Sequence, residues 1–431
     1  MLSCPLVTRV GIIGLGYVGL PLATAFAEVG VTVHGVDTDA AKIQAISDGR
    51  SYIGDVPSET LAAMVRDGRI TVATQGAGLS DCDAILICLP TPVDEHHTPD
   101  LRFVIAGAEV AAAHLSPGTL VVLESSTFPG TTRELVQPIL ESGGRHVGED
   151  FFLAFSPERI DPGNTRFSMR DTPRVVGGIT AECTRRAKEL YGRIVDHIHV
   201  VSTPESAEMS KLLENTFRAV NIALVNELAI LCDRMGIDVW ETIAAAATKP
   251  FGFMPFWPGP GLGGHCIPVD PFYLTWRAKA YDLNTEFVEL AGRVNVNMPY
   301  YAVSRIQRAL NRAGKPVQGS SILLLGMAYK PDVADLRESP SLKLLELLRK
   351  QGAEVAYHDP HVADLPNEGL SSMPLTGGLL RTIDCAVIAT AHAGVDLDLV
   401  VDCAPLVVDL RDAVRRSRTP GQALPPNVDV M

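Results

Sequence analysis

Short apolar runs alternate with longer amphipathic stretches through the first half of the chain. Val, Ile and Leu dominate the runs, and the stretches between them carry apolar residues at helical spacing. Strands of this kind, separated by helices, form parallel sheets that are covered by helices. The runs that we expect to be strands are residues 10–14, 31–37, 84–90, 120–126, 151–157 and 175–178. We therefore predict an N-terminal parallel-sheet domain over residues 1–204.

The pattern changes at Pro204. From Ser206 to Met235 the chain contains neither Pro nor Gly, and Gly236 follows directly, which are the usual signals for the start and end of a helix. Such a helix would be about 45 Å long, which is more than one small domain can bury. We predict that it links two domains and contributes to a dimer interface. A second helical stretch is expected at 285–313.

A second alternation of strands and helices follows the turn-rich segment 314–320, like an approximate duplication of the N-terminal part. The expected elements are strands at 321–329, 353–360, 384–391 and 406–410 and a helix at 341–352. The fold predicted from the whole chain is α/β, with two Rossmann-like parallel-sheet domains joined by a long central helix. Its three parts are residues 1–204, 205–314 and 315–431. We expect the Pro-rich tail beyond Arg415 to be loosely ordered.

The net charge limits the binding partners that we expect, and the cysteine content indicates the cellular compartment. The chain of 431 residues has 37 basic and 50 acidic side chains and a net charge of −13, which argues against binding nucleic acid or an anionic membrane. Its eight cysteines are scattered without a CxxC pair, which favours reduced thiols in the cytoplasm. The uncharged stretch Val10–Ala27 is interrupted by Gly and Pro, so we interpret it as a nucleotide-binding unit and not as a membrane segment.

The first chemical motif is Gly14-Leu15-Gly16-Tyr17-Val18-Gly19, which follows an expected strand and opens an expected helix. Glycines there allow a tight turn and a close approach of the backbone to pyrophosphate, while the helix N-terminus supplies free N–H groups. Asp37 ends the next strand at the spacing of a residue that accepts both adenosine ribose hydroxyls. Because its carboxylate would repel a 2′-phosphate, NAD is favoured over NADP. The alternative is a structural glycine turn without a ligand.

A single cysteine, Cys266, lies in the segment 258–270, which is rich in Gly and Pro. A loop of this composition is a poor way to build a core and a good way to present a thiol. Taken alone, the cysteine would more often be a buried structural residue. Asp270 four residues later and the expected NAD site favour a nucleophile. His265 is adjacent to the cysteine, which does not suit zinc binding, and we expect no metal; its role is loop structure or a local electrostatic one.

Further polar groups lie on the long helix and at strand ends. Lys211 and Asn215 are one turn apart on one helix face, where they are either a solvated stripe or, beside a cleft, a pair that stabilises an oxyanion. The segments 124–132 and 156–159 follow strand ends, where open α/β sheets bind their ligands. Capping and turns account for some of these hydroxyls, but Glu158 is a candidate acid–base group.

These motifs together resemble the UDP-glucose/GDP-mannose dehydrogenase family. The similar segments occur in order along nearly the whole chain, and they are GLGYVGLPLA, LPTP, ESSTFPGTT, SPER, EMSKLLENTFRAVNIALVNE, GPGLGGHCIPVDP, GMAYKPDVADLRESPS and VVDLRD. The resemblance implies an N-terminal NAD domain, a central helix that supports a homodimer and a C-terminal domain that holds the nucleotide diphosphate. It also implies a four-electron oxidation, in which Cys266 captures an aldehyde at the sugar C6 as a thiohemiacetal and then becomes a thioester.

The resemblance carries roles onto individual residues. The catalytic positions are Cys266 as nucleophile, Lys211 and Asn215 for the oxyanions, Asp270 and Thr127 for water or proton transfer, and Glu158 for hydrolysis. The NAD positions are Gly14, Gly16, Tyr17, Val18, Gly19, Asp37, Lys42, Thr91, Thr127 and Arg337. The substrate positions are Glu158, Arg159, Lys211, Asn215, Lys249, Gly263, Lys330 and Arg411. Lys211 would also lower the pKa of the thiol, which is about 8.5 for a free cysteine.

Two departures from the family pattern affect the assignment. Pro162 stands where the hexose dehydrogenases have a second glutamate, and Val269 stands where a lysine is frequent. The hydrolytic base is therefore open, whereas the surrounding segments resemble the branch that oxidises UDP-N-acetylhexosamines. Within that branch we expect UDP-N-acetylglucosamine, with UDP-N-acetylmannosamine or UDP-glucose as alternatives. Two further readings are an NAD-sensing scaffold without turnover and a two-electron hydroxyacid dehydrogenase, neither of which needs Cys266.

Overall fold

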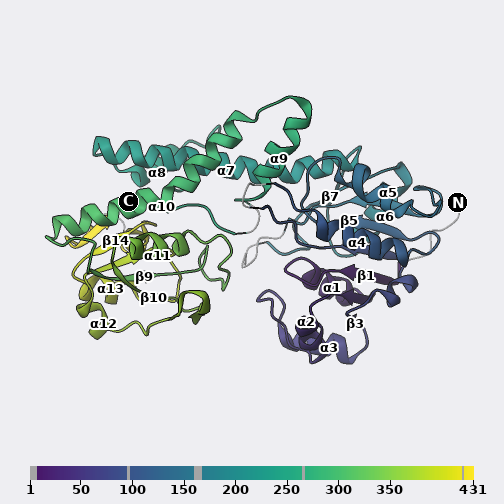
Figure 1. Ribbon diagram of the computed structural model, residues 1–431, viewed down its shortest axis with the longest axis horizontal. Coiled ribbons are helices and arrows are strands. Elements are labelled where there is room, and N and C mark those ends of the chain that lie inside the picture. Colours follow the sequence, from purple (N-terminus) through teal and green to yellow (C-terminus); the bar gives the residue numbers. More distant parts are fainter. Residues whose placement is uncertain (1–6, 95–97, 160–166, 265–266, 420–421) are drawn as a thin grey trace. The chain divides into compact units, whose positions relative to one another are not determined.

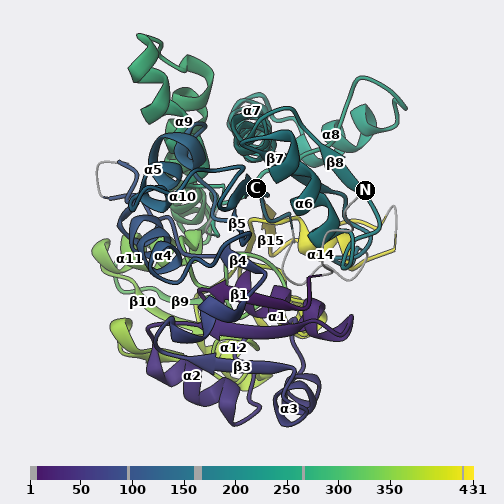
Figure 2. The same ribbon diagram turned by 90° about the vertical axis from the view of Figure 1, so that its right-hand side faces the viewer.

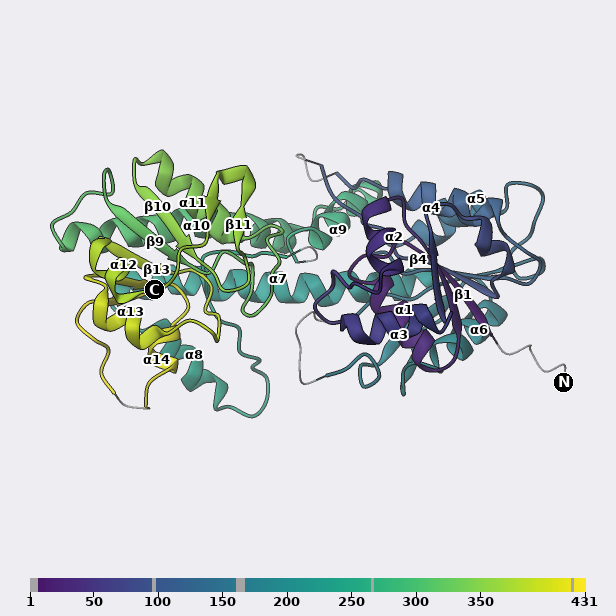
Figure 3. The same cartoon turned by 90° about the horizontal axis from the view of Figure 1, so that it is seen from below.

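The computed structural model describes residues 7–94, 98–159, 167–264, 267–419 and 422–431. The chain divides into two compact units, which we call the N-terminal unit (1–214 with 272–283) and the C-terminal unit (215–271 with 284–431). The boundary falls inside helix α7 (Pro204–Met235), which is one continuous helix in the range expected from its Pro and Gly signals (Figure 3). Among the described residues, no helix is both long enough and apolar enough to span a membrane.

The N-terminal unit is built on an eight-stranded sheet. In spatial order its strands are β3 (Ile70–Ala73), β2 (Thr32–Val36), β1 (Arg9–Ile13), β4 (Ala84–Ile87), β5 (Leu120–Leu123), β6 (Phe152–Phe155), β7 (Arg174–Gly178) and β8 (Ile198–Val200). The strands from β3 to β6 are parallel, as the alternation with helices predicted. The edge strands β3 and β8 are additions to the expected set.

The expectation that 175–178 continues the parallel sheet is wrong, because β7 pairs with β6 in the antiparallel sense. A parallel return needs a crossover that traverses one face of the sheet, usually through a helix. The described residues between β6 and β7 contain no helix, so the chain returns along the neighbouring strand instead. This places the carboxyl end of β6 next to the start of β7, and Glu158 close to Arg174.

Helices cover both faces of the N-terminal sheet. One core contains side chains of α1 (Gly19–Glu28), α2 (Ala40–Ser47), α3 (Ser58–Arg66) and α6 (Ala181–Tyr191). The other contains side chains of η1 (Ala77–Asp81), α4 (Arg102–Ala113), the π-helical η2 (Thr131–Val136) and α5 (Gln137–Leu140). Figure 2 shows α2 and α3 beside β3 at the sheet edge. The helices α9 (Asp270–Ala278, from Phe272) and η3 (Lys279–Tyr281) also belong to this unit.

The C-terminal unit has its own parallel sheet of five strands. In spatial order they are β10 (Glu354–His358), β9 (Ser321–Leu325), β13 (Cys385–Ile388), β14 (Val407–Asp409) and β15 (Val428–Val430), and β11 (Asp364–Leu365) pairs separately with β12 (Leu370–Ser371). One face packs against α10 (Glu286–Arg312) and α11 (Pro340–Lys350), and the other against α12 (Gly377–Thr382), α13 (Leu397–Cys403) and α14 (Ala413–Arg416) (Figure 1). The shorter elements are α8 (Val239–Ala247) and η4 (Pro366–Glu368).

The expectation of a loosely ordered tail beyond Arg415 is also wrong for its last residues. The last residues form β15, which pairs in parallel with β14 and is extended by a 2.9 Å hydrogen bond from Met431 N to Asp409 O. In addition, the indole Nε1 of Trp240 donates to Met431 O at 2.6 Å. The sequence gives little indication of this strand, because it is only three residues long and follows a Pro-rich stretch. It is ordered by pairing with the open edge of a sheet whose other strands lie earlier in the chain.

Candidate functional site

The three glycines of the first motif have different physical reasons to be glycine. Gly14 has φ of 93°, and a Cβ there would lie 2.5 Å from Cys88 O. A Cβ on Gly19 would lie 1.9 Å from Gly14 O, so the helix could not approach the strand as closely. Around Gly16, its chain neighbours aside, no heavy atom of the described residues lies within 4 Å of the ideal Cβ position, which leaves the space above its backbone open for a ligand.

Asp37, at the end of β2, faces this turn. Its Oδ2 accepts the Leu15 N–H at 2.9 Å and approaches Lys42 Nζ at 3.4 Å, while Oδ1 accepts the Asp39 N–H at 3.0 Å. These bonds fix the orientation of the carboxylate beside the open turn, as ribose recognition requires. The residues therefore fit an adenosine dinucleotide. Tyr17 is 41% exposed at the mouth of the turn, and Val18 precedes the first residue of α1.

The loops after β4 and β5 are joined by Ser125. Its hydroxyl donates to Leu89 O at 2.7 Å and accepts the Leu89 N–H at 3.0 Å. Thr91 and Thr127, which follow these two strands, are both buried. The Oγ1 of Thr127 has no hydrogen-bond partner among the described residues. A buried hydroxyl of this kind calls for a ligand or a water molecule, which suits the expected role of Thr127.

Glu158 belongs to a buried network of charges. The guanidinium of Arg174 contacts Glu158 Oε2 at 3.3 Å, forms an ion pair with Glu124, and donates from Nε to Ser156 Oγ at 2.9 Å. Tyr191 donates its hydroxyl proton to the other carboxylate oxygen of Glu124, Oε1. Burial raises the pKa of Glu124 to about 7, against the opposing effect of Arg174. One buried arginine thus holds two carboxylates at the ends of β5 and β6.

The first turns of α7 approach the same strand end. Lys211 Nζ donates to the backbone O of Glu158 at 2.5 Å. Arg159 pairs with Glu214 on α7 and donates to Pro173 O at 2.7 Å. Within the N-terminal unit, the expected residues Lys211, Glu158 and Arg159 therefore lie together.

The C-terminal unit brings together another expected pair. Asn215 Nδ2 donates to Asp270 Oδ2 at 2.5 Å, and both side chains are buried. The long helix thus carries an amide that orients a carboxylate four residues beyond the expected nucleophile. Cys266 itself, like His265 and Pro162, lies outside the described residues.

A cavity of about 710 Å³ in the C-terminal unit is lined by two expected substrate residues, Lys330 and Arg411. Arg411 donates from Nε to Ala389 O at 2.8 Å, and burial lowers its pKa to about 10. The stacked indoles of Trp240 and Trp257 form part of the wall, with ring centroids 5.7 Å apart. A half-buried arginine, a lysine and flat aromatic faces suit a ligand with both phosphate and base.

The remaining expected residues of this unit are more dispersed. A Cβ on Gly263 would lie 2.6 Å from Tyr329 Cβ, so this glycine allows a close approach of two loops. Lys249 Nζ lies 4.9 Å from the ring centroid of Phe251 and does not line the cavity. Arg337 forms an ion pair with Asp335, and its backbone O accepts the Gly264 N–H at 2.9 Å.

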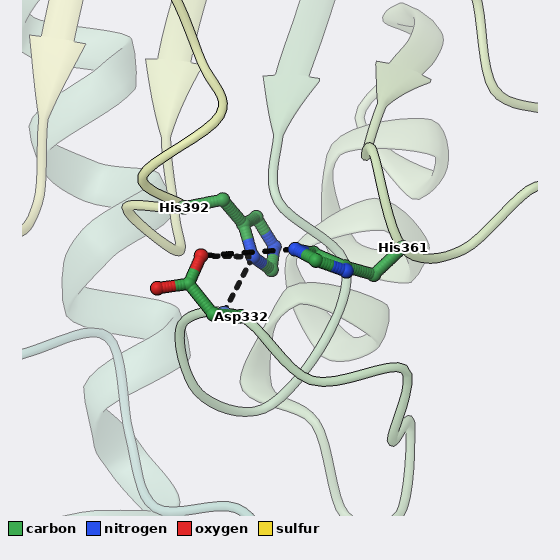
Figure 4. Close-up of side chains that lie close together, drawn as sticks. All are labelled: Asp332, His361 and His392. Carbon is green, nitrogen blue, oxygen red and sulfur yellow. Dashed lines mark hydrogen bonds and ion pairs between the residues drawn. The ribbon is translucent and has the colours of Figure 1, made fainter. Parts of the chain in front are cut away.

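Three side chains beside the cavity offer possible metal ligands: Asp332, His361 and His392 (Figure 4). Both ring nitrogens of buried His392 are engaged, because Nδ1 accepts the Asp332 N–H at 2.9 Å and Nε2 lies 3.1 Å from Asp359 Oδ2. A cation at Nδ1 would have to displace this backbone N–H. The arrangement instead fixes the loop that follows Lys330, since Asp332 Oδ1 also accepts the Ala393 N–H at 2.9 Å.

Sequence reasoning missed Arg174 and Glu208 as parts of the site, and it placed Glu124 in the candidate segment 124–132 without assigning it a role. Each is fully or almost fully buried, although charged residues are rarely buried unless they are paired. A signal was present for two of them, because Glu124 and Arg174 interrupt or flank runs of Val and Leu that we expected to be buried strands. Their partners could not be identified, since the residues meet only after the strands have paired.

Comparison with known proteins assigns all three parts of the chain to one family. Sequence models of the UDP-glucose/GDP-mannose dehydrogenase family match its NAD binding domain at residues 8–195, its central domain at 205–297 and its UDP binding domain at 323–416. The UDP-N-acetyl-D-glucosamine 6-dehydrogenase of Pseudomonas aeruginosa is 37% identical over 357 residues, which cover 82% of this chain and 83% of that protein. The UDP-N-acetyl-D-mannosamine dehydrogenase of Yersinia pestis is 36% identical, over 89% of this chain and 93% of that one.

The solved structures agree. A UDP-D-ManNAc dehydrogenase from Pyrococcus horikoshii superimposes with a TM-score of 0.88 at 32% identity, covering 98% of both chains. The expected fold of two Rossmann-like domains joined by a long helix is thereby confirmed, and so is NAD as the cofactor. With all three family domains matched in order, the protein belongs to the UDP-glucose/GDP-mannose dehydrogenase family and is an NAD-dependent UDP-sugar 6-dehydrogenase.

Proposed function

We propose that this enzyme oxidises UDP-N-acetylglucosamine at C6 to UDP-N-acetylglucosaminuronate, with Cys266 as a covalent nucleophile. The observation that carries the proposal is the buried Asn215–Asp270 hydrogen bond of 2.5 Å, four residues beyond Cys266. An oriented, buried carboxylate at that distance in the chain is suited to accept or direct a proton during chemistry at the thiol. Relatives from two bacteria that carry the UDP-N-acetyl-D-glucosamine 6-dehydrogenase name support the sugar.

The proposed reaction proceeds in two oxidations. NAD, when bound, accepts a hydride in each of them. After the first, the Cys266 thiolate adds to the C6 aldehyde and forms a thiohemiacetal, which the second converts to a thioester that water hydrolyses to the carboxylate. The alcohol protons pass to Asp270 or to water directed by Thr127, and Lys211 and Asn215 stabilise the oxyanions. Glu158 assists hydrolysis.

Different residues are assigned to the UDP group, to the sugar and to the cofactor. The UDP group occupies the cavity lined by Lys330 and Arg411, while Lys249, Gly263 and Arg159 contact the sugar or its surroundings. On the cofactor, Asp37 and Lys42 hold the adenosine ribose, Thr91 contacts the remainder of NAD, and Arg337 is a further cofactor residue. We retain residues 1–204, 205–314 and 315–431 as the NAD-binding, central and UDP-sugar-binding parts.

The experiment is NADH formation with limiting UDP-N-acetylglucosamine, with the product identified by mass. We expect two NADH per sugar, a uronic acid product, and loss of turnover in Cys266→Ser. Cys232→Ser, which changes a buried thiol on α7, is the matched control and should retain turnover. One NADH per sugar with an unaffected Cys266→Ser variant would refute the nucleophile and favour a two-electron enzyme. Absence of NADH with every UDP-sugar would favour the non-enzymatic NAD-sensing scaffold.

UDP-N-acetylmannosamine is the second candidate substrate. It is favoured by the name of the Yersinia pestis relative at 36% identity and by that of the Pyrococcus horikoshii structure. The two sugars differ only in configuration at C2, so the same assay run with each of them, and with UDP-glucose, compares kcat/KM directly. A larger kcat/KM for the mannosamine epimer or for UDP-glucose would overturn the choice of sugar and leave the mechanism intact.

We also propose a cytoplasmic homodimer that contacts through α7. In the C-terminal unit this helix carries a stripe of exposed apolar side chains at helical spacing: Phe217, Leu224, Leu228, Leu231 and Met235. Leu224, 54% exposed, is a suitable probe. Leu224→Glu should convert the dimer to a monomer in light scattering, while Glu227→Gln, an exposed neighbour, should not. A wild-type monomer at micromolar concentration would refute the proposal.

A further inference from the structure

A buried carboxylate on α7 takes no part in the chemistry described above. Glu208 is completely buried, and its two oxygens accept three hydrogen bonds from a single turn. Oε2 accepts the Gly130 N–H at 2.6 Å, and Oε1 accepts both the N–H and the hydroxyl of Thr132, at 2.8 and 2.7 Å. Burying a carboxylate is costly, so a turn that provides three donors to it indicates a specific structural requirement.

That turn is the start of η2, and its first donor, Gly130, lies three residues after Thr127. Gly130 precedes η2 with φ of 106° and has no side chain to cap the free N–H groups of the helix. Glu208 provides the cap from a distant part of the chain, and its negative charge suits the N-terminus of a helix. The cap therefore fixes the path of residues 128–132 and, through them, the position of Thr127.

The same helical turn also carries Lys211. Glu208 and Lys211 are three residues apart on α7, and Lys211 donates to the backbone O of Glu158 at 2.5 Å. One turn of helix is thus bonded both to the segment after β5, which contains Thr127, and to the segment after β6, which contains Glu158. Displacement of Glu208 from its cap would change the distance between these two strand ends.

We infer that Glu208 is a positioning residue for the dehydrogenase reaction. It holds residues 128–132, and through them Thr127, at a fixed position relative to Lys211. This inference rests on the proposed roles of Thr127 and Lys211. Glu208 does not touch the reacting atoms, and Thr127 is only one of the NAD positions, so loss of Glu208 should affect the rate of chemistry more than the affinity for NAD. Most of the NAD positions, among them the Gly14–Gly19 turn and Asp37, lie on other elements.

The isosteric variant Glu208→Gln is a severe test, because both sides of the carboxylate face backbone N–H donors. A glutamine has one carbonyl oxygen and one NH₂ group, so in either orientation the NH₂ group meets the N–H of Gly130 or of Thr132. A matched control lies one turn earlier on the same helix. Glu205 pairs with Arg133 of η2 at 2.6 Å and is 31% exposed, and Glu205→Gln removes the same charge while leaving the three donors to Glu208 in place.

The experiment compares the steady-state kinetics of Glu208→Gln and Glu205→Gln. We expect kcat to fall about 10- to 100-fold in Glu208→Gln, with KM for NAD within about threefold of wild type, since small misplacement of catalytic groups has effects of this size. In Glu205→Gln, kcat and KM should stay within about twofold. An unchanged kcat in Glu208→Gln, or an equal rise in the KM for NAD, would overturn the inference.

A double-mutant cycle tests whether the effect passes through Thr127. If it does, Glu208→Gln should lower kcat much less in a Thr127→Ala background than in the wild type, because residues that act as a unit are not additive. Full additivity would refute the coupling. Should Glu208→Gln fail to fold, Thr132→Val provides the test, since it removes one of the three donors; kcat is then expected to fall a few-fold at unchanged KM, and an unchanged kcat contradicts the inference.

Hydrogen exchange separates this inference from the proposed function. Amide exchange of the peptide 124–136 should be faster in Glu208→Gln than in wild type and Glu205→Gln, whatever the substrate of the enzyme. Absence of turnover in the wild type would refute the proposed function and leave this result standing. Equal exchange in all three proteins would refute the cap itself.

Discussion

Replacement of Arg174 by Met should destabilise the N-terminal unit strongly and change how its stability depends on pH. The guanidinium is 4% exposed and contacts Glu124 and Glu158, whose side chains are 0% and 12% exposed. Methionine fills much of the volume but leaves two carboxylates close together without a counter-charge. Removal of one partner of a buried ion pair costs about 3–5 kcal/mol. We expect a loss of this size at pH 8, above the pKa of Glu124 in the wild type.

The pH dependence follows from Glu124. Its pKa in the folded protein is raised to about 7, above the value of about 4.3 for an unfolded chain, so the native state binds the proton more tightly and stability falls as pH rises. Between pH 6 and pH 8 this group lowers the free energy of unfolding by about 1.4 kcal/mol in the wild type. Without Arg174 its pKa rises further, so the decrease becomes larger, up to the limit of about 2.7 kcal/mol for one proton over two pH units.

Urea denaturation followed by Trp276 fluorescence is the appropriate assay. Trp276 belongs to the N-terminal unit and packs against Phe128 with ring centroids 5.0 Å apart, whereas Trp240 and Trp257 belong to the other unit and are replaced by Phe for this purpose. Urea is preferred to guanidinium because it does not screen charges.

Two controls accompany the Arg174→Met variant. Arg170→Met breaks an exposed pair with Asp196, 65% and 49% exposed, and should change stability by less than about 0.5 kcal/mol. Adding Glu124→Gln to Arg174→Met should restore part of the stability and remove the extra pH dependence. A loss below about 1 kcal/mol at pH 8, or equal pH slopes in Arg174→Met and wild type, would refute the argument that Arg174 neutralises a buried carboxylate pair.

Further predictions concern the two ligand sites. Gly14→Ala should lower the urea midpoint of the N-terminal unit, because its Cβ would lie 2.5 Å from Cys88 O at φ of 93°; Gly16→Ala, with open space, should keep the midpoint and weaken NAD binding in a titration. Equal midpoints for the two variants would contradict this. His392→Ala should raise the dissociation constant for UDP about tenfold in calorimetry and leave that for NAD unchanged, whereas exposed His361→Ala should change neither by more than about threefold. An unchanged dissociation constant for UDP in His392→Ala would show that the hydrogen bonds of His392 do not support the loop that follows Lys330.

Much of the fold is visible in the sequence because it is determined locally. The apolar runs of β1, β2, β4 and β5 and the helix from Pro204 to Met235 each carry their own periodicity and their own start and stop residues. The same holds for the Gly14–Gly19 turn, whose geometry depends on a few neighbouring residues. The direction of β7 and the pairing of β15 were missed because they depend on which sheet edge is free after the rest has folded.

The partners of the residues that support the site could not be identified from the sequence for a related reason. Arg174 and Glu124 are 50 residues apart in the chain, and Glu208 is 78 residues from Gly130. No local pattern joins them, and each alone is one charged residue in or near an apolar segment. The groups expected to do chemistry lie in short motifs that the sequence displays, whereas the groups that hold them come from other strands and helices. A search for such supporting residues should therefore begin with charges in segments predicted to be buried, since burial of a charge is tolerated only where the fold provides its partner.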